Sequence, residues 1–174
     1  MTILFLLLLA LVAVATIAIP KLTPSYDRPV DVNAFLSDGA AAITADGYSQ
    51  NNSANGQYDT GAADLRFEAD LVLDVSAIDI SSADETYVLR VVGSNSSTFA
   101  SGVVVLASIE LGRSAAMGPA TINKTTGRYV QAIENAGYST AAGAIKNLQY
   151  LRLHVDVGGT TPSIQFTAFL APRQ

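Results

Sequence analysis

The pattern of apolar and polar positions divides the chain into two parts. Residues 3–19 are apolar throughout except for Thr16, and prolines follow closely after them. Proline cannot continue a helix and favours extended backbone, so residues 1–30 are interpreted as an apolar N-terminal arm with a proline-rich connector. Residues 31–174 are predicted to form a separate β-sandwich body.

The body alternates apolar and polar residues with a period of two, which is typical of β-strands with one buried face. In the last but one of these strands, Leu151 and Leu153 are predicted to face inward, and Arg152 and His154 outward. The pattern predicts strands at 67–75, 86–93, 102–111, 127–133, 148–157 and 163–170.

Turn residues separate the predicted strands, mainly Gly, Asn, Ser, Asp and Pro. The segment 158–162 lies between the last two strands and predicts a β-hairpin there. The strand at 102–111 is rich in β-branched residues and is predicted to be buried. Only 113–121 and 134–147 could hold a helix. The spacing therefore favours an all-β fold, an antiparallel β-sandwich or jelly-roll-like body with an apolar N-terminal arm.

Three interpretations of residues 3–19 are open. As a helix, the run would span roughly 25 Å, which is the short end for crossing a membrane, and Lys21 and Arg28 would mark a cytoplasmic flank. A signal peptide would fit the small residues Ala13 and Ala15, although no Lys or Arg precedes the run. The third interpretation is an arm that packs against protein within an oligomer.

The overall composition argues against several functional classes. Charged residues make up only 14% of the chain, whereas about 25% is usual. The net charge is −5 without a basic stripe, which argues against nucleic-acid binding. The absence of cysteine excludes disulfides, thiolate chemistry and cysteine-based zinc sites, and it fits folding in a reducing cytoplasm. The chain has a single histidine, so one copy cannot supply a multi-histidine metal site.

One tetrapeptide matches a catalytic motif. Residues 59–62 read D-T-G-A, as around the catalytic aspartate of pepsin-like and retroviral proteases, and a single copy would suit a dimeric enzyme. Such enzymes hold the aspartate after a rigid apolar strand, whereas residues 54–58 are mostly polar. The segment is therefore interpreted as a turn that leads into the strand at 67–75. A dimeric aspartic protease is the last of the functional alternatives.

Two other groups of side chains could carry chemistry. His154 and Asp156 share a strand face, but no G-x-S-x-G turn supplies a nucleophile, so His154 is interpreted as a surface or interface residue. Asp79, Asp84 and Glu85 lie near a turn without the ligand spacing of a calcium loop. We therefore expect no catalytic, cofactor-binding or metal-binding residues, no cofactor and no enzyme activity.

Several stretches together resemble a known family. They read LSDGAAAITADGYSQN at 36–51, YDTGAADL at 58–65, SNSSTFASGVVVLAS at 94–108 and YLRLHVDVGGTTPSIQFTAFLAPRQ at 150–174. They resemble the small capsid cement (decoration) proteins of tailed bacteriophages, the family typified by that of a Bordetella podophage. The resemblance covers roughly residues 35–174, and its C-terminal stretch is the most specific part. The apolar first thirty residues and the segment 112–127 depart from the family pattern.

The resemblance implies a jelly-roll-like fold without enzymatic activity. It implies a small homo-oligomer on the outer surface of an icosahedral head, across junctions between major capsid proteins. The protein would then be part of the virion, assembled in the host cytoplasm. The alternative is a membrane-anchored surface β-domain, adhesin-like or pilus-like, in which residues 3–19 cross a bilayer.

Overall fold

The computed structural model describes residues 34–63, 65–112, 125–138 and 145–173. The arm and connector at 1–30 lie outside the described residues, and so does 113–121. In chain order the strands are β1 (Phe35–Ser37), β2 (Gly47–Tyr48), β3 (Gln50–Asn51), β4 (Ala54–Asn55), β5 (Gln57–Asp59), β6 (Glu68–Ile78), β7 (Thr86–Ser94), β8 (Val104–Gly112), β9 (Gly127–Glu134), β10 (Ala136–Tyr138), β11 (Ile145–Asn147), β12 (Tyr150–Gly158) and β13 (Ile164–Pro172). The described part of 134–147 therefore holds β10 and β11 instead of a helix.

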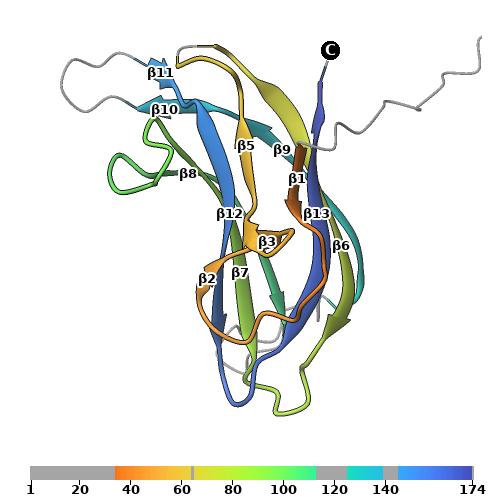
Figure 1. Cartoon of the computed structure of the whole chain (residues 1–174). Helices are drawn as coiled ribbons and strands as arrows, with labels where there is room; N and C mark the ends of the chain where they lie inside the picture. Colours follow the sequence, from red (N-terminus) through yellow and green to blue (C-terminus); the bar gives the residue numbers. More distant parts are fainter. Residues whose placement is uncertain (1–33, 64, 113–124, 139–144, 174) are drawn as a thin grey trace, which may run out of the picture.

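Most of the strands form two main sheets that pack face to face (Figure 1). The short pairs β3-β4 and β10-β11 form two further two-stranded sheets. Sheet A has the order β1-β13-β6-β9, and sheet B has the order β2-β12-β7-β8. In sheet B, β5 and β2 pair with successive parts of the same edge of β12, so together they act as one interrupted edge strand. The pairs within both sheets are antiparallel. The predicted all-β, antiparallel sandwich is confirmed.

The prediction of a hairpin at 158–162 is wrong. β12 lies in sheet B and pairs with β7, whereas β13 lies in sheet A and pairs with β6 and β1. The segment does reverse the chain, with Gly159 and Thr161 at φ values of +98° and +58°, but the reversal carries the chain across the sandwich (Figure 1). Turn residues indicate that the chain reverses, and they do not specify which strand it pairs with afterwards.

The core lies between the sheets and comes from alternate residues of the long strands. Leu71 and Leu73 of β6 face Leu151 and Leu153 of β12, and all four are at most 1% exposed. Burying such a side chain stabilises the fold by about 1.5–3 kcal/mol relative to leaving it exposed. The predicted alternation at 67–75 and at 148–157 is confirmed in both strands.

The prediction that 102–111 is a buried strand is wrong for its first half. Ile109 and Leu111 are buried, but Val103 and Val105 are 44% and 54% exposed. Within the described residues β8 pairs only with β7, so it lies at the edge of sheet B. β-Branched residues favour a strand wherever it lies in a sheet, and they do not distinguish an edge from the centre.

Candidate functional site

The D-T-G-A segment is an exposed turn. Asp59 ends β5, and its Oδ1 accepts hydrogen bonds from the Gly61 N–H at 2.8 Å and from Gln149 Nε2 at 3.1 Å. Gly61 has a φ of +93°, which glycine adopts without steric cost. A carboxylate bonded to the N–H two residues further on is an Asx turn, so the turn interpretation is confirmed.

The carboxylates near residue 80 bind separate parts of the surrounding turns. Asp79 accepts a hydrogen bond from the Ser81 N–H at 2.9 Å, and this bond is the main cause that lowers the pKa of Asp79. Asp84 accepts from the N–H and the hydroxyl of Thr160 at 3.1 and 3.0 Å. Buried Glu85 accepts from the Ser82 N–H at 2.8 Å. Within the described residues, no three His, Cys, Asp or Glu side chains are grouped to hold a metal ion.

The outer face of sheet B brings together a group of aromatic and charged side chains. Its members are Tyr48, Arg90, Phe99, Arg152, His154 and Asp156, and we call them the β12 face cluster. Asp156 forms an ion pair with Arg90 from β7, and His154 Nδ1 lies 3.0 Å from Asp156 Oδ1. His154 is therefore a half-exposed outer residue, as the alternation predicts.

Arg152 is the centre of this cluster. Its guanidinium carbon lies 4.4 Å from the centre of the Phe99 ring and 5.2 Å from that of Tyr48. Its Nε and Nη2 donate to Gln57 Oε1 at 3.0 and 2.7 Å, and Nη2 also donates to the Ser97 carbonyl at 3.0 Å. These contacts hold the guanidinium in one position, and each cation–π contact contributes about 0.5–1 kcal/mol at an exposed site.

Phe99 reaches the cluster from the loop between β7 and β8. Its backbone has a φ of +57°, which is uncommon and strained for a bulky side chain. Its N–H donates to the Ser96 carbonyl at 3.0 Å, and its side chain is buried against Tyr48 and Arg152. Packing against the cluster is what offsets the strain.

Sequence reasoning missed half of this cluster. Alternation along β12 identified Arg152, His154 and Asp156 as outward-facing, but it gave no reason to associate them with Phe99 or Tyr48. The available signal was a lone phenylalanine in the polar loop SNSSTFAS. Arginine and aromatic side chains are enriched in the cores of protein–protein interfaces, so the arrangement suits a protein contact.

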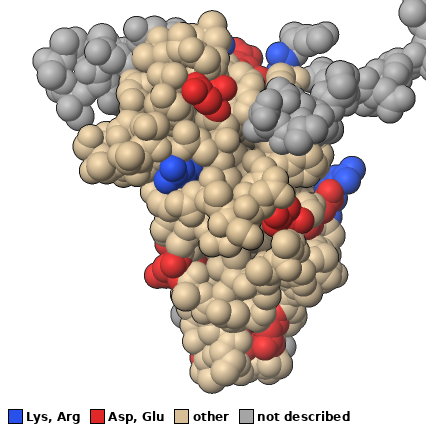
Figure 2. Space-filling model, in the orientation of Figure 1, with Lys and Arg blue, Asp and Glu red and all other residues tan. Residues whose placement is uncertain are grey.

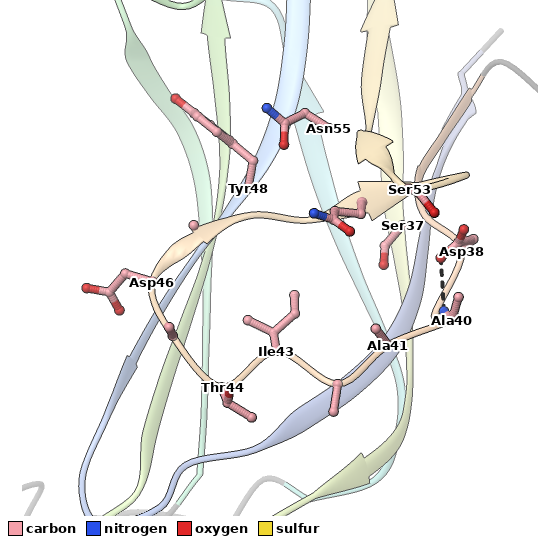
Figure 3. Close-up of a pocket in the computed structure, with 14 residues that line it drawn as sticks. Ser37, Asp38, Ala40, Ala41, Ile43, Thr44, Asp46, Tyr48, Ser53 and Asn55 are labelled. Carbon is pink, nitrogen blue, oxygen red and sulfur yellow. Dashed lines mark hydrogen bonds between the residues drawn. The ribbon is translucent and has the colours of Figure 1, made fainter.

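A hollow of about 460 Å³ is bordered by the segment 37–55 (Figure 3). Figure 3 shows Ile43 pointing toward its interior and Asp46 pointing away, where Asp46 accepts a hydrogen bond from the Val157 N–H at 2.8 Å. Asp38 accepts from the N–H groups of Ala40 and Asn52, and these bonds, that of Ala40 first, lower the pKa of Asp38. Ligand pockets are lined mainly by large apolar and aromatic side chains, whereas this one is lined mainly by alanines and polar residues, with Ile43 and Tyr48 as its larger apolar and aromatic side chains. The hollow is therefore interpreted as a surface depression formed by this loop and not as a ligand pocket.

Most of the visible surface carries no charge. Figure 2 shows acidic and basic side chains scattered singly or in small groups over a face that is otherwise uncharged.

Among the residues that the structure describes, no helix is long and apolar enough to cross a membrane. The apolar run at 3–19 lies outside those residues.

Comparison with known proteins identifies no relative. No protein-family model, curated protein or solved structure matches the chain. The resemblance to capsid cement proteins therefore stays a prediction from the sequence.

Proposed function

We propose that this protein is a structural virion protein that binds the outside of an icosahedral phage head and stabilises contacts between major capsid proteins. It acts as a small homo-oligomer and catalyses no reaction. The observation that carries the proposal is the order in which the chain visits the two sheets.

With β2 and β5 counted as one edge strand, each sheet has four strand positions. In chain order, the first, third, sixth and eighth positions lie in sheet A, and the second, fourth, fifth and seventh lie in sheet B. This order supports a jelly roll, in which eight strands form two facing sheets. Jelly rolls are common in viral capsid proteins, and also in lectins and cupins, so the fold supports a virion role without requiring it.

The stretches that resemble cement proteins fall on the elements that define the sandwich. The segment 150–174 contains β12 and β13, which have neighbours on both sides in sheets B and A. The segment 36–51 contains most of β1 and borders the hollow, and the D-T-G-A letters form the Asx turn before β6. The stretches that resemble cement proteins thus contain residues that build the fold, which is what we expect of a protein with a structural role.

The β12 face cluster is the surface that we assign to the capsid. Arg152 is held by contacts with two aromatic rings and by its hydrogen bonds, so little side-chain freedom would be lost on binding. An oligomer would present several copies of this surface at once, and linked weak contacts gain strength through high effective concentration.

Co-sedimentation with heads assembled from the major capsid protein of the encoding phage tests this assignment. Wild-type protein is expected to sediment with the heads. Arg152→Glu should lose most of the binding, and Arg66→Glu, which changes an exposed arginine outside the cluster, should keep it. Folding of each variant is checked by circular dichroism. Failure of folded wild-type protein to bind at micromolar concentration contradicts the proposal.

The alternative is a membrane-anchored surface β-domain, adhesin-like or pilus-like, and the apolar run at 3–19 favours it. Flotation of the full chain with liposomes in the absence of heads would support that alternative. A dimeric aspartic protease would require a peptidase activity that Asp59→Asn abolishes.

A further inference from the structure

The outer edge of β9 is open to another strand. β9 pairs with β6 along its whole length without a register shift, and within the described residues no strand pairs with its other edge. Such an edge presents N–H and C=O groups without a strand partner, and proteins usually protect it with a bulge, a proline or an inward-pointing charge. In β9 the Ala132 carbonyl accepts a hydrogen bond from Gln131 Nε2 at 3.2 Å. β9 has none of these three protections, and its centre at 129–133 is uncharged.

The neighbouring edge strand β8 is better protected. Its pairing with β7 shifts register between Val91 and Val92, where Val91 is opposite Ala107 and Val92 is opposite Val105. A bulge of this kind increases the local twist and interrupts the ladder, which disfavours pairing with another chain. β9 is therefore the edge of the two that suits strand addition.

An apolar row crosses the outer face of sheet A and ends at this edge. Val130 of β9 lies opposite Val72 of β6, which lies opposite Phe169 of β13, which lies opposite Phe35 of β1. The rings of Phe35 and Phe169 are 5.6 Å apart, and Val130 is 58% exposed. A strand added to β9 would extend this row and cover Val130.

The charges of β9 complement each other in an antiparallel self-pairing. If two copies of β9 pair around a two-fold axis at Gln131, Arg128 of each copy lies opposite Glu134 of the other, and Val130 lies opposite Ala132. Opposite charges across strands stabilise a pairing, and the two-fold axis forms each contact twice. Shifting the centre to Val130 or to Ala132 keeps the faces matched but separates the charges.

We propose that a second copy of this chain pairs with β9 in this register, so that sheet A continues through both copies. The proposal rests on the self-association named in the proposed function, and it identifies the interface of that self-association. It does not require capsid binding. If the protein does not bind heads, the β9 pairing is unaffected. If the protein does not form the dimer, the head-binding result is judged separately.

Disulfide trapping tests the register, because the full chain has no cysteine of its own. Directly opposed residues in antiparallel strands have Cα atoms about 4.5–5.5 Å apart, within the range that a disulfide allows. Gln131→Cys is therefore expected to form a covalent dimer. A mixture of Val130→Cys and Ala132→Cys should form mixed dimers in preference to dimers of either alone. No enrichment of mixed dimers, or efficient trapping by Val105→Cys on β8, would overturn the proposal.

A matched pair of lysine variants tests, by sedimentation velocity, whether the β9 edge contributes to dimer formation. Lysine on an exposed edge strand is a natural block to pairing. Val130→Lys should shift the full chain from dimer to monomer, whereas Val105→Lys, at a valine of similar exposure on β8, should leave the dimer unchanged. A wild-type monomer at high micromolar concentration, or equal behaviour of the two variants, would refute the β9 interface.

Discussion

The two lateral sides of the sandwich are built in different ways. On the side of β1, β2 and β5, the segment 37–60 closes the gap between the sheets. Ser49 donates from its hydroxyl to the Leu36 carbonyl at 2.6 Å, and Asn51 donates from Nδ2 to the Phe35 carbonyl at 3.3 Å. We call this the closed side.

On the open side, the edges of β8 and β9 lie next to each other with grooves between them. Two grooves of about 370 and 350 Å³ are lined by residues of both strands. Val103, Val105 and Val130, three of the four exposed large apolar residues of the described chain, belong to this side. Backbone groups at an edge must bond to something, so a chain that seals one side and leaves the other apolar is suited to association there.

The largest expected effect on stability comes from a substitution that disrupts the closed side. Gly56 is buried, and a methyl group there would overlap the Leu36 carbonyl. Gly56→Ala must therefore move the β1 backbone, and it should lower the free energy of unfolding by about 3 kcal/mol. Gly47→Ala is the control, because nothing lies within 4 Å of its added methyl group. Urea denaturation measures both variants, and equal midpoints would contradict the close approach at Gly56.

A smaller effect is expected at the corner where β9 leaves the open side. Asn135 is fully buried, donates to the carbonyls of Leu65 and Leu148 at 2.7 and 3.0 Å, and accepts from the Phe67 N–H at 2.8 Å. Asn135→Ala leaves these groups without their side-chain partner and should cost about 2 kcal/mol. The exposed Asn55 provides the control, and Asn55→Ala should change stability by less than about 0.5 kcal/mol.

The smallest effect concerns the ion pair that ties β9 to β6. Arg128 donates from Nε and Nη2 to the Asp74 carboxylate at 2.7 Å each, and this bond is the main cause that lowers the pKa of Asp74 below 3.8. Because the pKa is lower in the folded chain, the stabilisation is present above about pH 4, the unfolded value, and is lost as the pH falls through the folded value.

Denaturation of wild type and Asp74→Asn between pH 2 and pH 6 measures this contribution, with these limits set around the unfolded pKa of about 4. The wild type should be slightly more stable at the upper end, and the difference should shrink as the pH falls. A difference that stays constant with pH would show that the ion pair contributes nothing. The effect is small because both side chains are partly exposed to solvent, which screens the pair.

Much of the fold could be predicted from local patterns. Alternation located β6, β7, β9, β12 and β13 to within a few residues. It identified the buried faces of β6, β12 and β13, because the side chains of a strand point alternately to its two sides. The short strands β2 to β5 were not predicted, since two or three residues are too few for a period to appear. The candidate site was predicted only where it lies on β12, because alternation says nothing about what a distant loop contributes.

The sequence by itself determined the long strands, the inward faces of β6, β12 and β13, and the turn at Asp59, because each depends on neighbouring residues. The tertiary structure decided the features that depend on which strands lie side by side. It placed β12 and β13 in different sheets, left β8 at an edge, and brought Phe99 over Arg152. Pairing is set by the packing of residues far apart in the chain, so a local pattern identifies a strand but not its neighbours.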